Sequence, residues 1–237
     1  MVPDLDELIS ANVAAGGSLG ARAAYRSMSA TGRALARLYW HLDVVHPERF
    51  PQSGAFILAP NHRSNIDFML PALATTRRVR WMAKHSIFFD GPINRSLRAL
   101  GAFPVDRDST DRIALRTARG VVADGQPIVM FPEGRRKEGP TILDMFDGPA
   151  YVSCCERVPI LPMGMGGSER AMPIGSKMVR PADIVIVVGE LIYPDVPLKG
   201  RVPRSSVSEL TARLGVALQG LYDEARSISE GRTANRR

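Results

Sequence analysis

The chain has 237 residues, and its hydrophobic fraction of 45% and charged fraction of 23% are those of an ordinary globular domain with a large core. Its formal net charge of +7 favours an anionic partner: a polyanion, a phosphorylated metabolite or an anionic membrane surface. No stretch approaches the roughly 18 apolar residues of a membrane span, and the acidic residues near the beginning are unlike a signal peptide. We therefore expect any membrane contact to be peripheral.

Residues 1–50 are predicted to form an N-terminal helical segment. After an acidic and then Gly- and Ala-rich beginning, the pattern from Ala21 to Val45 is typical of an amphipathic helix with arginines among its polar positions. Its apolar side consists of Leu35, Leu38, Tyr39 and Leu42. We expect this side to pack on the core. In the alternative interpretation, the arginine-rich surface of the helix lies on lipid headgroups.

Residues 51–227 alternate between short apolar runs and amphipathic segments, which predicts one α/β domain. Continuous apolar runs are typical of strands buried on both faces, so we predict a mixed, partly parallel sheet flanked by helices. A Gly- and Met-rich loop is expected after Met163, and residues 228–237 are expected to be a disordered tail. The predicted strands are 55–59, 79–83, 127–131, 158–163 and 184–188, and residues 101–107 are predicted to be a turn into a brief strand that ends at a charged loop. The predicted helices are one capped by Ser109 or Thr110 that ends near Ala123, and those at 146–156 and 206–226.

A histidine and an aspartate stand five residues apart after the first of these strands. His62 follows Pro60, which removes a backbone donor, and Ser64 is placed to cap a helix that begins near Asn65. Asp67 then lies in the first helical turn, where a carboxylate is favoured and can hydrogen-bond the imidazole. A carboxylate that holds one ring nitrogen makes the other a better base. In the alternative interpretation, Asp67 only caps the helix and His62 is an ordinary loop residue.

Basic residues follow the other predicted strands. Because the carboxyl ends of parallel strands meet at one edge of a sheet, that edge is predicted to carry His62, Lys84, Arg107 and the loop from Glu133 to Arg136. A general base among cationic side chains indicates a hydroxyl nucleophile on an anionic, for example phosphorylated, substrate. The alternative is that each arginine belongs to an ordinary solvated loop.

Metal and cysteine chemistry are the first rivals to this interpretation. Besides His62, the chain has His41, His46 and His85, which show no metal-site spacing, so no metal or other cofactor is expected. Cys154 and Cys155 are adjacent, so they cannot form an ordinary disulfide with each other, and a reduced, cytosolic setting fits them. Thiols in a helix before a strand are usually small buried hydrophobes rather than nucleophiles.

Four sequence blocks resemble those of the PlsC-type glycerolipid acyltransferases, the 1-acyl-glycerol-3-phosphate acyltransferase family. Asn61-His62 with Asp67 is similar to the family's Asn-His-x4-Asp block. The second, third and fourth blocks are matched by residues 101–107, 131–136 and 158–162. The four occur in the family's order, which makes the resemblance stronger than any single block.

This resemblance implies a glycerolphosphate-acyltransferase-like fold and transfer of a fatty acyl group from an acyl-CoA or acyl carrier protein thioester. The acceptor implied is a hydroxyl of a lysophospholipid or glycerol 3-phosphate, in phospholipid biosynthesis at the cytoplasmic face of the cell membrane. His62 is implied as the general base and Asp67 as its orienting partner, without a covalent acyl-enzyme. The substrate-binding residues implied are Lys84, Arg107, Glu133, Gly134, Arg135 and Arg136. The expected partners are the acyl thioester, the phosphorylated glycerolipid and an anionic membrane surface.

The third block departs from the family pattern. The family usually has Glu-Gly-Thr-Arg-Ser, whereas this chain has the more cationic residues 133–137, Glu-Gly-Arg-Arg-Lys. An acceptor with a more charged or bulkier headgroup, such as another membrane lipid or glycolipid, is therefore an alternative. A non-catalytic basic protein that binds membrane surfaces is a rival of a different class. Nucleic acid is disfavoured as a partner because aromatic residues make up only 6% and are not interleaved with the arginines.

Overall fold

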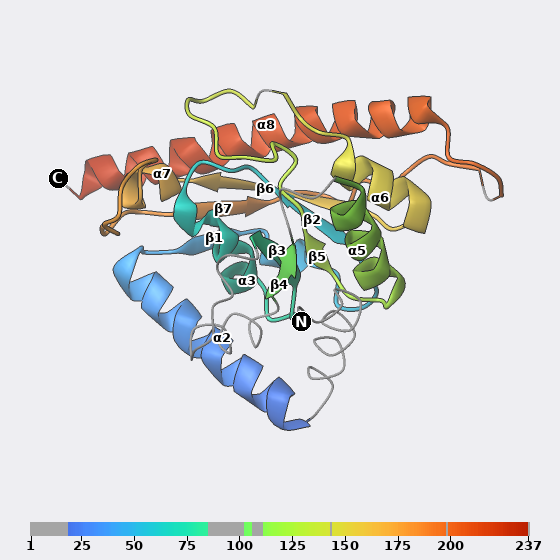
Figure 1. Cartoon of the computed structure of the whole chain (residues 1–237). Coiled ribbons are helices and arrows are strands. Elements are labelled where there is room, and N and C mark those ends of the chain that lie inside the picture. Colours follow the sequence, from blue (N-terminus) through green and yellow to red (C-terminus); the bar gives the residue numbers. More distant parts are fainter. Residues whose placement is uncertain (1–18, 85–101, 106–110, 143, 198, 237) are drawn as a thin grey trace.

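The computed structural model describes residues 19–84, 102–105, 111–142, 144–197 and 199–236, in which one mixed sheet lies between two layers of helices (Figure 1). The strands are β1 (Asp43–Val45), β2 (Ile57–Pro60), β3 (Arg80–Lys84), β4 (Ala102–Val105), β5 (Ile128–Val129), β6 (Ile160–Gly166) and β7 (Val185–Val188). The helices are α2 (Leu19–Tyr39), η1 (Pro47–Arg49), η2 (Asn65–Phe68), α3 (Leu70–Ala74), α5 (Asp111–Ala123), α6 (Gly148–Glu156), α7 (Ser168–Ala171) and α8 (Arg204–Asn235). The predicted α/β class is confirmed.

The strand order of the described sheet is β1-β7-β6-β2-β5-β3-β4. β2 is parallel to its neighbours β6 and β5, and β3 is parallel to β5 and β4, whereas β7 is antiparallel to β6. The parallel block therefore presents the carboxyl ends of β2, β3, β4 and β5 at one edge of the sheet. This is the edge at which the sequence predicts the site.

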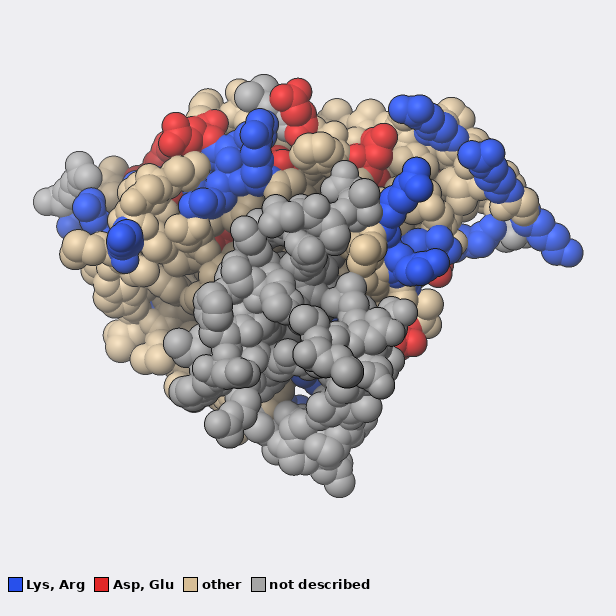
Figure 2. All heavy atoms as spheres, viewed as in Figure 1, with Lys and Arg blue, Asp and Glu red and all other residues tan. Residues whose placement is uncertain are grey.

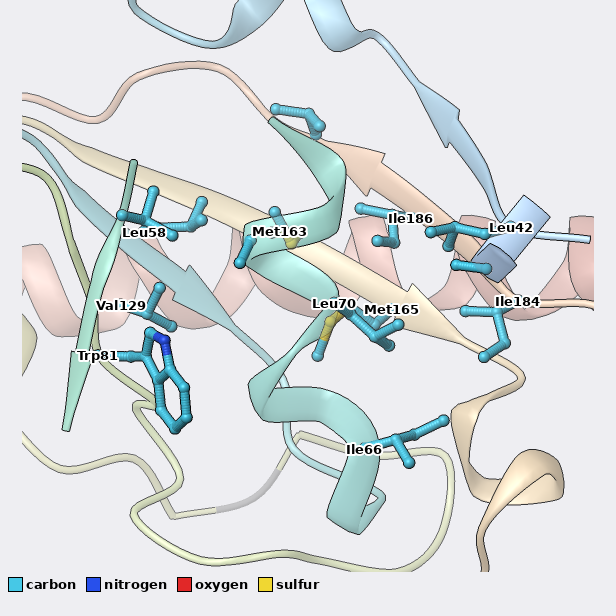
Figure 3. Packing of buried hydrophobic residues seen from close by; sticks show 14 of the residues in the cluster. Leu42, Leu58, Ile66, Leu70, Trp81, Val129, Met163, Met165, Ile184 and Ile186 are labelled. Atoms are coloured by element: carbon cyan, nitrogen blue, oxygen red, sulfur yellow. The ribbon is translucent and has the colours of Figure 1, made fainter. Parts of the chain in front are cut away.

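Successive residues of the central strands belong to two different cores, because side chains alternate between the faces of a sheet. Leu58 and Leu161 pack with residues of α2, η2 and α3, whereas Ile57 packs with residues of α5, α6 and α8. Figure 3 shows side chains of the first core, among them Leu70 of α3. The sheet thus separates a layer that contains α2 and α3 from a layer that contains α5, α6 and α8.

The N-terminal helix ends earlier than predicted, and a strand follows it. α2 stops at Tyr39, and His41 has a left-handed backbone with a φ of 43°, which a helix cannot continue through. β1 then pairs in parallel with β7 at the outer edge of the sheet. The prediction of one helix through Val45 is therefore wrong. A strand of three residues is too short for an alternating pattern to be recognised.

The side of α2 that packs on the core also differs from the predicted one. Leu35 and Leu38 are 59% and 77% exposed. The buried stripe of the helix instead contains Tyr25, Ser29 and Ala36, which recur with helical spacing. Small residues in this stripe let α2 lie close to the layer beneath it, and the leucines remain on the outer side. Among the described helices, none has both the length and the apolar composition that crossing a bilayer requires.

β6 continues through the residues that the sequence predicts to be a Gly- and Met-rich loop, and all of it is buried. The glycines are required because α8 crosses the strand in close contact. A Cβ atom on Gly164 would lie 2.2 Å from the backbone of Leu221, and one on Gly166 would lie 2.6 Å from that of Ala225. The loop prediction is therefore wrong: glycine here permits close backbone approach rather than a turn.

α8 extends to Asn235, so the predicted disordered tail from residue 228 is wrong for the part that the structure describes. Its last turns are held by polar contacts with distant segments. Arg232 Nη2 lies 2.6 Å from Asp43 Oδ2, and Thr233 Oγ1 lies 3.1 Å from Asp183 Oδ2. The polar composition that suggested disorder thus provides hydrogen bonds and ion pairs within the fold.

Candidate active site

His62 and Asp67 meet at the carboxyl end of β2. The His62 Nδ1 atom lies 2.9 Å from the Asp67 Oδ2 atom. Because an ionised carboxylate can only accept, Nδ1 carries the proton and the lone pair of Nε2 is free to act as a base. The His62 ring stacks on Phe131, with 4.3 Å between the ring centroids. The Asp67 side chain is fully buried and 16% of the His62 side chain is exposed, so the imidazole is the member of the pair that a substrate can reach.

Asp67 also caps a helix, so both sequence interpretations of this residue describe part of its environment. η2 begins at Asn65, and Ser64 Oγ accepts a hydrogen bond from the Ile66 amide. Asp67 Oδ2 in turn accepts from the backbone N–H groups of Ser64, at 2.6 Å, and Arg63, at 2.5 Å. One carboxylate oxygen therefore receives three hydrogen bonds. The other, Oδ1, is buried without a hydrogen-bond partner among the described residues.

Two further side chains fix the loop that carries His62. Asn61 Nδ2 donates to the Met165 carbonyl at 3.0 Å, and Asn61 Oδ1 accepts from the Met165 amide at 2.6 Å. Ser64 Oγ donates to the Met172 carbonyl at 2.7 Å. The loop is thereby held to β6 and to the segment after α7. Such supporting contacts preorganise a catalytic group, because they leave it few alternative positions.

A buried ion pair between Arg63 and Glu133 contacts the backbone of His62. The Arg63 Nη1 atom is 2.6 Å from Glu133 Oε2, and the two side chains are 1% and 0% exposed. Glu133 Oε1 also accepts a hydrogen bond of 2.9 Å from the His62 amide. The sequence predicts a substrate contact for Glu133, but its carboxylate is buried and occupied by protein donors. The structure corrects this expectation, because Glu133 holds the backbone of His62 in place.

Sequence reasoning missed Arg63, which stands at one of the unspecified positions of the first block. Its Nε donates to the Gly139 carbonyl at 3.2 Å and its Nη2 to the Thr141 carbonyl at 3.1 Å. Its Cζ lies 4.8 Å from the ring centroid of Tyr222 in α8. The guanidinium thus joins the loop after β2, the loop after β5 and α8. The sequence shows an arginine in the first block and a glutamate in the third, but nothing in it indicates that these two residues form an ion pair.

The rest of the third block turns outwards. Gly134 has a left-handed backbone with a φ of 65°, and Arg135 and Arg136 after it are exposed. The Lys137 amide donates to the His62 carbonyl at 2.9 Å, which holds the far end of this turn against the loop that carries His62. The two exposed guanidinium groups therefore belong to a loop that is attached to the backbone of His62.

Of the other two predicted cationic residues, Lys84 and Arg107, the structure describes only Lys84. Lys84 is the last residue of β3, so its backbone lies at the same sheet edge as His62. Arg107 lies outside the described residues. Of the predicted phosphate-binding residues, the structure therefore brings the backbone of Lys84 and the exposed Arg136 to one edge.

An apolar groove opens beside η2, with a volume of about 660 Å³. Its walls include Leu35 and Leu38 of α2 on one side and Phe68 and Trp81 on the other. Phe68 directly follows Asp67 in η2, whereas neither His62 nor Asp67 lines the groove itself. Concave apolar surfaces of this size are typical of sites for hydrophobic ligands.

Metal and cysteine chemistry, the two rival interpretations of the sequence, can be compared with the described residues. In the part of the chain that the structure describes, no three His, Cys, Asp or Glu side chains are grouped so that they could hold a metal ion. Cys154 is buried in α6, and this burial raises the pKa of its thiol to about 11. A thiol that stays protonated at neutral pH is a poor nucleophile.

Comparisons with known proteins match this chain to a family. A family model described as Acyltransferase matches residues 41–166, which is more than half of the chain. The 1-acyl-sn-glycerol-3-phosphate acyltransferase of Bacillus subtilis is 22% identical over 153 residues, which are 64% of this chain and 74% of that protein. The human 1-acyl-sn-glycerol-3-phosphate acyltransferase beta is 27% identical over 129 residues. That alignment covers 51% of this chain and only 45% of the human protein.

The fold is also similar to a solved structure. The crystal structure of PlsC, the 1-acyl-sn-glycerophosphate (LPA) acyltransferase from Thermotoga maritima, superposes with a TM-score of 0.68. The superposition covers 86% of this chain and 80% of the other at 23% sequence identity. At this low identity, the similarity is evidence for the fold and not for the function. The histidine–aspartate pair, the buried ion pair and the third block all lie within the residues that the family model matches.

Proposed function

The chain belongs to the Acyltransferase family, and we propose that it transfers a fatty acyl group from a thioester to a hydroxyl of a lysophospholipid or of glycerol 3-phosphate, in phospholipid biosynthesis. The observation that carries this proposal is the 2.9 Å contact between His62 Nδ1 and Asp67 Oδ2, which leaves Nε2 free at the carboxyl edge of the sheet. The names of the bacterial and human relatives state the same class of reaction.

In the proposed reaction, His62 Nε2 takes the proton of the acceptor hydroxyl while the hydroxyl oxygen attacks the carbonyl carbon of the thioester. The tetrahedral intermediate then collapses, the carbon–sulfur bond breaks, and the imidazolium returns the proton to the leaving thiolate. Asp67 stabilises the imidazolium through its Oδ2 atom. The transfer is direct and needs neither an acyl-enzyme nor a cofactor. General-base help of this kind contributes about 10²- to 10⁴-fold to the rate.

The acceptor phosphate is proposed to bind the exposed part of the third block. Arg136 is exposed and lies on a turn that is attached to His62, and Lys84 and Arg107 are proposed to assist it. Charge-assisted hydrogen bonds from guanidinium groups suit a phosphate. Arg135 adds a second exposed cation where the family usually has a small hydroxyl residue. It supports the alternative of another membrane lipid or glycolipid with a larger or more anionic headgroup.

We propose a peripheral membrane contact, at the cytoplasmic face, and its support is the apolar outer side of α2. Leu35, Leu38 and Tyr39 are exposed to 59%, 77% and 44%, and all three also line the apolar groove. A lipid substrate that leaves the bilayer at α2 can therefore keep its chain in apolar surroundings up to the residues next to Asp67.

The test of the reaction is transfer from labelled acyl-CoA to a panel of lysophospholipids, glycerol 3-phosphate and glycolipids, with the product identified by mass spectrometry. His62→Ala should reduce transfer about 10²- to 10⁴-fold while its circular dichroism spectrum stays that of the wild type. His46→Asn is the matched control, because His46 is partly exposed, has a left-handed backbone with a φ of 59° and, among the described residues, hydrogen-bonds only Glu48 through its ring. Unimpaired transfer by His62→Ala would falsify the mechanism.

The rival of a non-catalytic membrane-binding protein is tested by flotation with anionic vesicles. We expect the wild type and His62→Ala to float equally, and Leu35→Ser with Leu38→Ser to float less, because α2 provides the contact and His62 does not. Wild-type flotation without any transfer to the acceptor panel would support the rival. No flotation at all would count against a lipid acceptor.

A further inference from the structure

A second concave surface lies on the opposite face of the sheet, between α5, α6 and the beginning of α8. It consists of two adjoining hollows of about 690 Å³ and 360 Å³, which share Leu115 and Tyr151. We call this surface the basic groove and define it by Arg112, Leu115, Arg116, Tyr151, Arg201 and Arg204. In Figure 2, Lys and Arg side chains gather on the right, where Figure 1 places α5 and the segment that leads into α8.

The walls of the basic groove carry an excess of positive charge that the described side chains do not neutralise. Arg112 and Arg116 of α5 are exposed, as are Arg201 and Arg204 across the groove, and none of the four bonds another described side chain. A fifth arginine, Arg119, pairs with Glu156 at 2.6 Å. Asp147 is the one carboxylate among the described lining residues, and its Oδ1 already accepts from Thr211 at 2.8 Å.

Apolar residues also line the basic groove. Leu115 is half-buried at the junction of the two hollows, Tyr151 beside it is 36% exposed, and Val202 lines the larger hollow. Arg112, Arg116 and Arg119 recur every three or four residues and thus form one stripe on α5 about 10 Å long. Arginines from two separate elements together with apolar lining residues match a helix that is acidic at its sides and apolar at its contact stripe. A single nucleotide phosphate would instead need donors that converge on one point.

The position of the basic groove connects it with the catalytic edge. The Phe146 amide donates to the Pro132 carbonyl at 2.8 Å, so the residue before Asp147 is bonded to the residue before Glu133. At the same time, α5, α6 and α8 cover the face of the sheet opposite to α2. A membrane that contacts the outer side of α2 is therefore separated from the basic groove by the sheet. The groove faces a soluble partner.

We propose that the basic groove docks an acidic helix of a soluble carrier protein that brings the acyl thioester to His62. This inference rests on the proposed function, because acyl transfer requires a thioester donor. A carrier protein bears its acyl group on a long flexible arm, so a partner docked beside Asp147 can deliver the thioester to the nearby catalytic edge. Charge complementarity at such a surface mainly accelerates encounter and selects the partner.

The experiment compares two donors that carry the same acyl chain, palmitoyl-CoA and a palmitoylated bacterial acyl carrier protein, with one soluble acceptor. The test variant is Arg116→Glu with Arg204→Glu, which reverses one charge on each wall. We expect KM for the carrier-protein donor to rise about tenfold and KM for palmitoyl-CoA to stay unchanged. In the wild type, KM for the carrier-protein donor should rise with ionic strength more steeply than KM for palmitoyl-CoA, because surface charges are screened by salt.

The matched control is Lys177→Glu with Arg180→Glu, which changes the net charge equally at two exposed residues outside the groove. This control should leave both KM values unchanged. If the reversed variant does not fold, Arg116→Gln with Arg204→Gln should show the same selective effect at smaller size. An equal loss with both donors, or no change with either donor, would overturn the docking proposal.

Binding of the carrier protein is measured separately by fluorescence anisotropy, so that docking and chemistry are distinguished. Selective loss of this binding in Arg116→Glu with Arg204→Glu supports the inference even for a His62→Ala background. A wild type that uses palmitoyl-CoA but neither binds nor uses the carrier protein would refute the inference and leave the proposed function standing. The opposite result is also informative. If the wild type binds the carrier protein through the basic groove but transfers no acyl group, the docking surface is supported and the proposed function is contradicted.

Discussion

The loops after β2 and after β5 meet at one edge of the sheet but use their polar side chains differently. In residues 61–67, the side chains of Asn61, Arg63, Ser64 and Asp67 hydrogen-bond protein partners, whereas the His62 ring uses only its Nδ1 atom in such a bond among the described residues. In the loop after β5, Glu133 is buried while Arg135 and Arg136 are exposed. Arg63 and Arg136 are thus the same residue type in two sequence blocks but in different environments, one buried and ion-paired and the other exposed. Burial separates the residues that position the base from those left available to a ligand.

The largest expected effect comes from breaking the buried ion pair. Arg63→Met leaves the Glu133 carboxylate buried without its cation, and removing one partner of such a pair typically costs about 3–5 kcal/mol. We expect a loss of this size in the free energy of unfolding, measured by urea denaturation. Arg136→Met, at an exposed position of the neighbouring loop, should change it by less than about 0.5 kcal/mol.

A double variant sharpens this prediction. Arg63→Met with Glu133→Gln removes both charges, so its cost should be clearly smaller than the sum of the two single costs. Additive costs would mean that the two side chains contribute independently. The distinction between a coupled positioning loop and an open binding loop would then be lost.

Asp67→Asn is expected to have the next largest effect, and on catalysis rather than on folding. The amide oxygen can still accept the hydrogen bonds that hold the loop, but the negative charge that stabilises the imidazolium is gone. We expect kcat to fall about 10²-fold, equivalent to about 2.7 kcal/mol. Stopped-assay kinetics with acyl-CoA would measure it. If kcat stays at the wild-type value, Asp67 acts only as a helix cap.

The elements that the sequence predicts well are those whose signals are local. The apolar runs of β2 to β7 and the cap at Ser64 can be recognised within a few residues, and so can the spacing of His62 and Asp67. The pairing of Arg63 with Glu133 cannot be recognised in this way, because 70 residues separate them and only the sheet brings them together.

The errors have the same origin. Gly164 and Gly166 resemble a loop in the sequence, but they are required by α8, whose contacting residues lie more than fifty positions later. Leu38 resembles a core residue, yet the tertiary contacts of α2 bury Ala36 instead. The local hydrophobic pattern predicts whether an element is a helix or a strand. Which side of the element is buried, and where it ends, depend on contacts with residues that are distant in sequence.

Arg136→Ala should have a smaller effect that is confined to the acceptor. A lost charge-assisted hydrogen bond to a phosphate corresponds to about a tenfold rise in the acceptor KM, with kcat and the free energy of unfolding unchanged. Arg180→Ala, at another exposed arginine, is the control and should leave KM unchanged. A change confined to the acyl donor would contradict the assignment of the loop after β5 to the acceptor.

The smallest expected effect is that of Gly134→Ala, which tests whether the exposed loop after β5 can change its conformation. Gly134→Ala places a Cβ on a left-handed residue with a φ of 65°, which costs about 1 kcal/mol of unfolding free energy. That Cβ would also lie 2.7 Å from Phe146 Cε2, but Phe146 is 63% exposed and can move aside.

Gly125→Ala is the matched control, because Gly125 has a φ of 74° and open space around its Cβ position. If the two variants lose similar free energies in urea denaturation, the contact with Phe146 relaxes and the turn is adaptable. A loss at Gly134 several times that at Gly125 would show that Phe146 is held in place. The loop after β5 would then be preorganised like the loop after β2, and Arg135 and Arg136 would be fixed before the acceptor binds.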